Sequence, residues 1–80
     1  MYFVYILQSI NYSHKRYVGC TQDLKNRLGH HNSKNSPYTA RYAPWKLVSY
    51  IAMENKEKAY EFEKYLKSGS GRVFVLKRLM

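Results

Sequence analysis

The stretch RYVGCTQDLKNRLGHH, residues 16–31, contains the change from strand to helix on which the fold depends. Aromatic and β-branched side chains are typical of a β-strand, which we expect over residues 15–20. Thr21 or Gln22 then begins a helix that continues to about the end of the stretch. Asp23 falls in its first turn, where a carboxylate caps the helix and interacts favourably with its dipole.

This helix carries ionisable groups inside its apolar stripe. At about 100° per residue, one of its faces holds four side chains: Leu24, Arg27, Leu28 and His31. An unpaired charge in an apolar environment costs several kcal/mol. These groups should therefore be paired, hold a ligand, or line a cleft at the edge of the stripe.

A helix expected over residues 55–67 repeats the pattern. Its apolar face holds Ala59, Phe62 and Leu66 together with Glu63, whereas Glu61 points to the opposite side. Two interpretations follow for Arg27 and Glu63. They form a structural ion pair between the two helices, or they belong to a functional cleft.

The other elements follow from patterns of apolar residues and turn residues along the chain. They are a strand over residues 2–9, a turn at 11–13, a loop over 32–44, a strand over 45–53, the helix over 55–67 ended by the glycine-rich SGSG at 68–71, and a short last helix over 72–80. This order predicts an α+β fold, in which a small three-stranded antiparallel sheet is flanked by helices (strand, strand, helix, strand, helix, helix).

Charge is the strongest indication of a partner. The chain has 80 residues, and 14 Lys and Arg against five Asp and Glu leave a net charge of +9. Four of the five acidic residues lie within residues 54–63, so most of the remaining chain is uniformly basic. Such a surface favours nucleic acid, because each neutralised phosphate releases counterions. Charge that only maintains solubility is the alternative.

The cysteine count and the hydropathy pattern set further limits. The single Cys20 excludes an internal disulfide and a zinc site built from cysteines. No apolar run approaches the roughly 20 residues of a membrane span, and the start MYFVYILQS has no basic region typical of a signal peptide. We therefore expect a cytoplasmic protein that does not bind membranes.

Cleavage of a phosphodiester bond would use the residue types that these elements present. An arginine can bind a phosphate through two hydrogen bonds, and a lone carboxylate can hold a hydrated Mg²⁺ that substrate oxygens also coordinate. A tyrosine hydroxyl can take part in proton transfer, and a glycine on the neighbouring strand allows close approach. The chain supplies these parts as Tyr5, Tyr17, Gly19, Arg27, His31 and Glu63.

Several of these residues stand in motifs that resemble the GIY-YIG nuclease domain. The motifs are VYI at 4–6, YVG at 17–19, Arg27 within DLKNRL, His31 four residues later, and Glu63 within FEKYLK. The likeness runs from residue 2 to about residue 72 and is greatest to small stand-alone bacterial GIY-YIG proteins. It implies that residues 1–80 form one such domain.

The resemblance also implies an activity, the hydrolysis of phosphodiester bonds in DNA with Mg²⁺, for which Mn²⁺ could substitute. Either Tyr17 or Tyr5 would help to activate the water, and Arg27 would bind the scissile phosphate. His31 would assist at that phosphate, and Glu63 would hold the metal ion. DNA is the expected partner, RNA stays an alternative, and the sequence leaves the oligomeric state open. The expected setting is DNA repair or processing, with selection for the structure of the DNA.

The chain departs from the family pattern in two places. Val4 stands where the first motif usually has glycine, although the following tyrosine is kept. Val75 stands where many members have an asparagine that follows the metal-binding glutamate by about twelve residues. A nucleic-acid-binding module without catalysis is therefore an alternative function, and a protein-interaction domain with only a structural Arg27–Glu63 pair is another.

A set of basic residues outside the motifs is expected to contact the backbone of the nucleic acid, because no acidic residue is near them in the sequence. The set is Lys34, Arg41 and Lys46. Gly29, in the interior of the first expected helix, has no explanation at this level.

Overall fold

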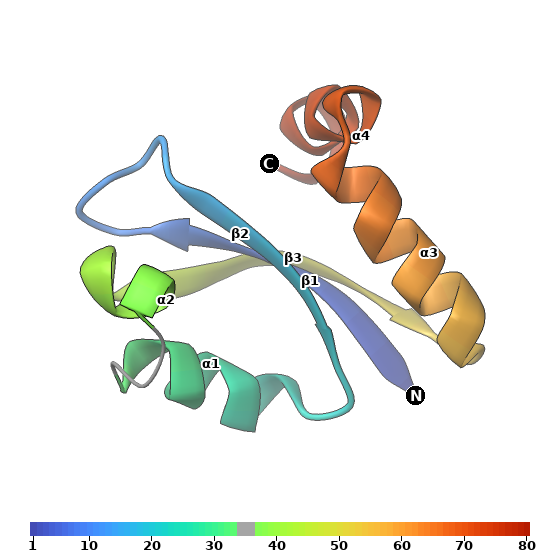
Figure 1. The fold of residues 1–80 in the computed structure, drawn as a ribbon, viewed down its shortest axis with the longest axis horizontal. Coiled ribbons are helices and arrows are strands. Elements are labelled where there is room, and N and C mark those ends of the chain that lie inside the picture. Colours follow the sequence, from blue (N-terminus) through green and yellow to red (C-terminus); the bar gives the residue numbers. More distant parts are fainter. Residues whose placement is uncertain (34–36) are drawn as a thin grey trace.

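The computed structural model describes residues 1–33 and 37–80, and its secondary structure confirms an α+β fold. The elements are β1 (Tyr2–Ser9), β2 (Arg16–Thr21), α1 (Leu24–Asn32), α2 (Pro37–Arg41), β3 (Trp45–Met53), α3 (Lys56–Lys67), α4 (Gly69–Phe74) and a π-helical turn (Val75–Leu79). The three strands form one antiparallel sheet in the order β2-β1-β3 (Figure 1).

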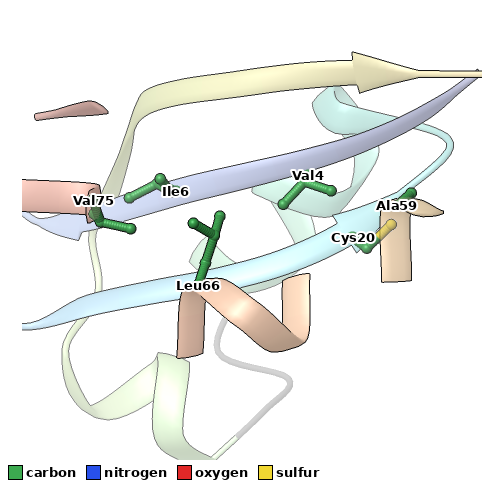
Figure 2. Close-up of a cluster of buried hydrophobic side chains, with 6 residues drawn as sticks. All are labelled: Val4, Ile6, Cys20, Ala59, Leu66 and Val75. Atoms are coloured by element: carbon green, nitrogen blue, oxygen red, sulfur yellow. The ribbon is translucent and has the colours of Figure 1, made fainter. Parts of the chain in front are cut away.

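The central strand β1 is covered on both faces, as its continuous apolar sequence indicates. Val4 and Ile6 point toward α3 and the C-terminal helices, where they join Cys20, Ala59, Leu66 and Val75 in a buried cluster (Figure 2). Tyr5 and Leu7 point to the opposite face, where they pack with Trp45 and are flanked by side chains of α1. Helices α1 and α2 therefore cover one face, and α3 and α4 cover the other (Figure 1).

Helix α1 begins slightly later than Thr21 or Gln22, where the sequence predicts its start. Asp23 is its N-cap, and the Asp23 side chain accepts a hydrogen bond from the Asn26 backbone N–H at 3.1 Å. Thr21 instead ends β2, and its hydroxyl oxygen accepts a hydrogen bond from the Asp23 N–H at 3.1 Å. The chain thus turns from strand to helix within two residues.

The expected loop over residues 32–44 was wrong in part, because it contains α2, a helix of five residues. Pro37 is its first residue, and this is the position where proline is tolerated because the missing N–H has no helical partner. The indole N–H of Trp45 donates to the Thr39 carbonyl at 2.7 Å, which holds α2 against the sheet. The Asn32 side chain makes two hydrogen bonds with the Trp45 backbone, at 2.6 and 3.2 Å.

The SGSG segment ends α3 as expected but also begins α4, earlier than the predicted last helix over 72–80. Ser68 is both the C-cap of α3 and the N-cap of α4, and its hydroxyl oxygen accepts a hydrogen bond from the Gly71 N–H at 3.2 Å. A Cβ on Gly71 would overlap the Tyr65 backbone carbonyl. Glycine is therefore needed where α4 packs against the end of α3.

Gly29 differs, because it lies inside α1 with no atom within 4 Å of the position a Cβ would occupy. Gly29→Ala should raise the free energy of unfolding by about 0.5–1 kcal/mol, since alanine loses less backbone entropy in a helix. Urea denaturation measures the change, and Gly71→Ala should be destabilising in the same assay. A less stable Gly29→Ala protein would contradict this account of α1.

Candidate active site

The site is built around a contact between the central strand and α1. The Tyr5 hydroxyl lies 2.9 Å from His31 Nε2, within hydrogen-bond distance, although 26 residues separate the two in the chain. Tyr5 is 1% exposed and His31 is 3% exposed. His31 is therefore more deeply buried than its place on an amphipathic helix suggests, and the sheet and the helix fix both rings.

Gly19 makes this contact possible. In the antiparallel register Gly19 of β2 is directly opposite Tyr5 of β1. A Cβ built on Gly19 would overlap the Tyr5 hydroxyl and ring, so the tyrosine crosses the neighbouring strand where that strand has no side chain. The glycine of the YVG motif is therefore a requirement for packing the tyrosine of the VYI motif.

Gly19→Ala should consequently displace the Tyr5 ring and destabilise the protein by about 1–3 kcal/mol, as overpacking of a dense core typically does. Equilibrium unfolding in urea measures the loss. Gly69→Ala is the matched control, because a Cβ there meets no atom within 4 Å. Equal stability of the two variants would show that Tyr5 can move aside freely.

Burial keeps Tyr5 and His31 neutral near pH 7. Desolvation raises the pKa of the Tyr5 hydroxyl well above its usual value, and Tyr17 and Glu63 add to this while the nearby Arg27 guanidinium opposes it. Desolvation also lowers the pKa of His31, and the positive charge of Arg27 acts in the same direction. Within the described residues, the buried Nδ1 of His31 has no hydrogen-bond partner. The pair is thus an uncharged tyrosine beside an uncharged imidazole.

Tyr17 lies on the open side of this pair. Its ring centroid is 4.6 Å from that of His31 and 6.3 Å from that of Tyr5. Tyr17 is only half-buried and lines a groove of about 410 Å³ at the β2 edge of the sheet. It is therefore the more accessible of the two candidate tyrosines.

Glu63 of α3 lies on the other face of the sheet and lines a separate pocket on that helix, outside the groove. Its side chain is 19% exposed, and its Oε2 lies 3.4 Å from Nζ of Lys67, one helical turn later. The Lys67 Nζ is in turn 6.0 Å from the Tyr17 ring. Glu63 also contributes to the raised pKa of both Tyr5 and Cys20, so its charge acts on the interior beneath the site.

The structure does not contain the alternative ion pair between Arg27 and Glu63. Glu63 pairs with Lys67 instead, and Arg27 is exposed at the margin of the apolar stripe of α1. Leu24 and Leu28 are the half-buried residues of that stripe. The long Arg27 side chain reaches from this margin toward the Tyr5 hydroxyl, so its charge lies at the edge of the apolar stripe.

Comparison with known proteins agrees with this geometry. The sequence model described as "GIY-YIG catalytic domain" matches residues 1–76. The chain belongs to the GIY-YIG family. This is a nuclease family.

Three curated relatives are similar to this GIY-YIG domain. The UPF0213 protein YsiG of Lactococcus lactis subsp. lactis (strain IL1403) is 40% identical over 67 residues, which are 82% of this chain and 62% of the relative. A UPF0213 protein of L. lactis subsp. cremoris (strain SK11) is 37% identical, over 82% of this chain and 66% of its own length. The UPF0213 protein CPE1444 of Clostridium perfringens (strain 13 / Type A) is 38% identical, over 84% of this chain and 71% of its own length. The chain therefore spans less than two thirds of the length of the first two.

Glu63 could bind a metal ion only as a single carboxylate ligand. The described residues contain no group of three or more His, Cys, Asp or Glu side chains that could bind a metal. A single partly exposed carboxylate suits Mg²⁺, which retains several waters and is commonly completed by phosphate oxygens of the substrate. Glu63 would hold such an ion together with the nucleic acid, at the place where Lys67 is its present partner.

The groove beside Tyr17 contains residues that sequence reasoning missed. Its lining is basic and aromatic: His14, Lys15, Arg16, Tyr17, Val18, Tyr38, Leu66, Lys67, Arg72 and Val75. Lys67 could have been recognised, because a lysine four residues after a glutamate on a helix is a standard pair. The contribution of Tyr38 could not, because it depends on α2.

The structure also places Val75, Arg41 and Lys46. Val75, at the position of the family asparagine, is buried in the cluster shown in Figure 2, so apolar packing replaces a polar side chain there. Arg41 at the end of α2 and Lys46 near the start of β3 are exposed. Lys34 lies outside the described residues. No helix in the described part of this GIY-YIG domain is long and apolar enough to cross a membrane.

Proposed function

We propose that this GIY-YIG protein is a metal-dependent endonuclease that hydrolyses phosphodiester bonds in DNA. The observation that carries the proposal is the contact of Tyr5 and His31 with Tyr17 at one basic groove, near enough to Arg27 and Glu63 for both charges to act on the Tyr5 hydroxyl. Family membership supports a nucleic-acid substrate. The net charge of +9 supports attraction to the phosphate backbone.

Each residue type has a distinct task in this proposal. The exposed guanidinium of Arg27 binds the scissile phosphate, where negative charge increases in the transition state. Glu63 would hold Mg²⁺, or Mn²⁺ in its place, and such an ion would supply positive charge to the phosphate. His31 stays neutral and buried, so it acts by orienting the tyrosines rather than as a cation at the phosphate.

The two tyrosines have different environments and therefore different proposed roles. Tyr5 is buried, its pKa is raised, and its hydroxyl is already engaged by His31. Tyr17 is half-buried and lines the groove, where an attacking water has access. We therefore propose that Tyr17 contacts the water. Tyr5 would position His31 beneath Tyr17.

A nucleic-acid-binding module without catalysis is the second candidate. Two observations favour it: Val75 is a core residue where many members have asparagine, and Lys67 already pairs with the Glu63 carboxylate. In this case the basic groove binds nucleic acid but Mg²⁺ does not displace Lys67.

The free, buried Cys20 is compatible with a reducing cytoplasm, which we propose as the location of the protein. DNA repair or processing is the proposed setting.

Incubation with labelled duplex, flap, junction and single-stranded DNA, and with RNA, tests the two candidates. The endonuclease should cut at least one of these substrates when Mg²⁺ or Mn²⁺ is added and none in EDTA. Binding to every substrate without cleavage would favour the non-catalytic module. Absence of both binding and cleavage would contradict both functions.

Basic residues outside the motifs should contribute to the salt dependence of binding. Neutralising Lys34, Arg41 and Lys46 together should reduce the slope of log affinity against log salt by up to about three, because each lost phosphate contact lowers it by nearly one. Titrations of a labelled duplex at several salt concentrations measure the slope. An unchanged slope would place the binding surface on another face.

A further inference from the structure

A cluster of four aromatic rings lies beside the candidate active site and includes residues that the proposed catalysis does not use. Tyr38 of α2 is central to it. Its ring centroid is 6.3 Å from Tyr17, 5.3 Å from Tyr42 and 6.2 Å from Trp45. The cluster therefore continues directly from the catalytic tyrosine into the groove.

Tyr38 is exposed, yet its neighbours hold it in place. The residue is 45% exposed, while Trp45 stacks against its ring with an interplanar angle of 28°. Trp45 is itself buried, and its indole N–H donates to the carbonyl of Thr39, next to Tyr38 in α2. A ring ordered in advance loses little conformational entropy when a second ring stacks on it.

The charges around Tyr38 specify what would stack there. Lysine, arginine and histidine side chains line the same groove, and none of its described lining residues is acidic. Lys15 lies 5.1 Å from the ring of the adjacent Tyr42, and Arg41 lies 5.5 Å from it. A basic groove with an ordered aromatic ring is the arrangement that binds single-stranded nucleic acid, because cations bind the phosphates and rings stack the bases.

We propose that Tyr38 stacks an unpaired base, so that the preferred substrate has a single-stranded segment next to the cleaved phosphate. A base within a duplex is stacked on both sides and cannot offer a face to this ring. The inference rests on the proposed nuclease function for its position beside the scissile bond. The stacking itself is a binding property that can be measured without cleavage.

The chain offers a closely matched control residue. Tyr60 of α3 is also 45% exposed, and its pocket is lined by two lysines and three glutamates. In the described part of the chain it makes no ring contact and does not line the basic groove. Tyr60 thus has the residue type and exposure of Tyr38, but neither its basic groove nor its ordered aromatic environment.

Binding is measured in EDTA with the full chain, using fluorescence anisotropy of a labelled single-stranded DNA and of a blunt duplex of the same sequence. Tyr38→Leu should weaken binding of the single strand by about fivefold to a hundredfold, the usual value of one stacked base, and leave duplex binding nearly unchanged. Tyr38→Phe should bind like wild type, and Tyr60→Leu should affect neither ligand. Equal effects on both ligands, or no effect on either, would overturn the inference.

A second measurement leaves the protein unaltered. In a series of single strands that each lack one base, wild-type protein should lose affinity at one position, and Tyr38→Leu should abolish that dependence. A uniform response along the strand would overturn the inference even if Tyr38→Leu unfolds.

Cleavage of flap and blunt duplex with Mg²⁺ is measured separately. Cleavage of both at equal rates, with Tyr38→Leu silent, defeats this inference and leaves the nuclease intact. Tyr38-dependent single-strand binding without any cleavage supports the stacking and defeats the nuclease.

Discussion

Glu63→Gln should reduce Mg²⁺-dependent cleavage at least a hundredfold while affinity for DNA is unchanged or increases. Glutamine keeps the size of the side chain and its hydrogen-bonding shape but lacks the charge needed to hold the ion. Affinity does not fall, because a negative charge has been removed from a strongly basic protein, next to Lys67 of the groove. Single-turnover cleavage and anisotropy in EDTA separate the two effects.

The Lys67 contact makes this variant easy to interpret. The Glu63–Lys67 pair joins positions i and i+4 of α3 and is partly exposed, so its loss should cost only about 0.3–0.5 kcal/mol. A buried Arg27–Glu63 pair would have cost several times more, but the structure lacks it. Glu63→Gln should therefore melt close to the wild-type temperature, so that lost cleavage cannot be attributed to unfolding.

Glu61→Gln is the internal control, because Glu61 is exposed two residues away and makes no ion pair in the described part of the chain. It should cleave like wild type. A stably folded Glu63→Gln protein that cleaves at the wild-type rate would defeat the single-carboxylate metal site. Equal losses in both variants would indicate an effect of net charge on α3 rather than of one ligand.

The sheet could be predicted from the sequence because its strands have strong and local signals. The expected strands over residues 2–9 and 45–53 coincide with β1 and β3, and the strand over 15–20 differs from β2 by one residue at each end. Runs of aromatic and β-branched residues between turn residues specify such strands without reference to distant parts of the chain. The helix over 55–67 also agrees, because Asn55 proved to be its N-cap.

The parts that were missed depend on tertiary contacts. Pro37 and the polar residues around it are typical of a loop, and the five residues of α2 gain their stability from the bond between Trp45 and the Thr39 carbonyl. Helix α4 begins at Gly69 although glycine has a low helix propensity. This start is explained by the close approach of Gly71 to the end of α3, which no local pattern reveals.

The candidate site was predictable as a set of residues but not as a geometry. Helical spacing placed Arg27 and His31 on the inner side of α1, and the motifs added Tyr5, Tyr17 and Glu63. The contact between Tyr5 and His31 requires knowledge that α1 packs on the face of β1 that carries Tyr5. The exposure of Arg27 and the Lys67 partner of Glu63 likewise follow from how the helices sit on the sheet.

The difference in burial between the tyrosines leads to the second large prediction. Tyr17→Phe should reduce the cleavage rate by about a hundredfold to ten-thousandfold, the usual contribution of a group that takes part in proton transfer. Its stability should be nearly unchanged, since within the described residues the Tyr17 hydroxyl has no hydrogen-bond partner. Single-turnover rates at saturating DNA and a thermal melt test both statements.

Tyr5→Phe should lose more stability than Tyr17→Phe but less of its cleavage activity. It removes the hydrogen-bond partner of His31 Nε2 from a buried position, which should cost about 1–3 kcal/mol of stability. Its effect on cleavage should be only about tenfold, because His31 and Gly19 still confine the ring and the proton-transfer group at the groove is intact. Single-turnover rates of the two variants, measured together with their melting temperatures, distinguish positioning from chemistry. A larger rate loss in a stably folded Tyr5→Phe protein would reverse the assignment of the two tyrosines.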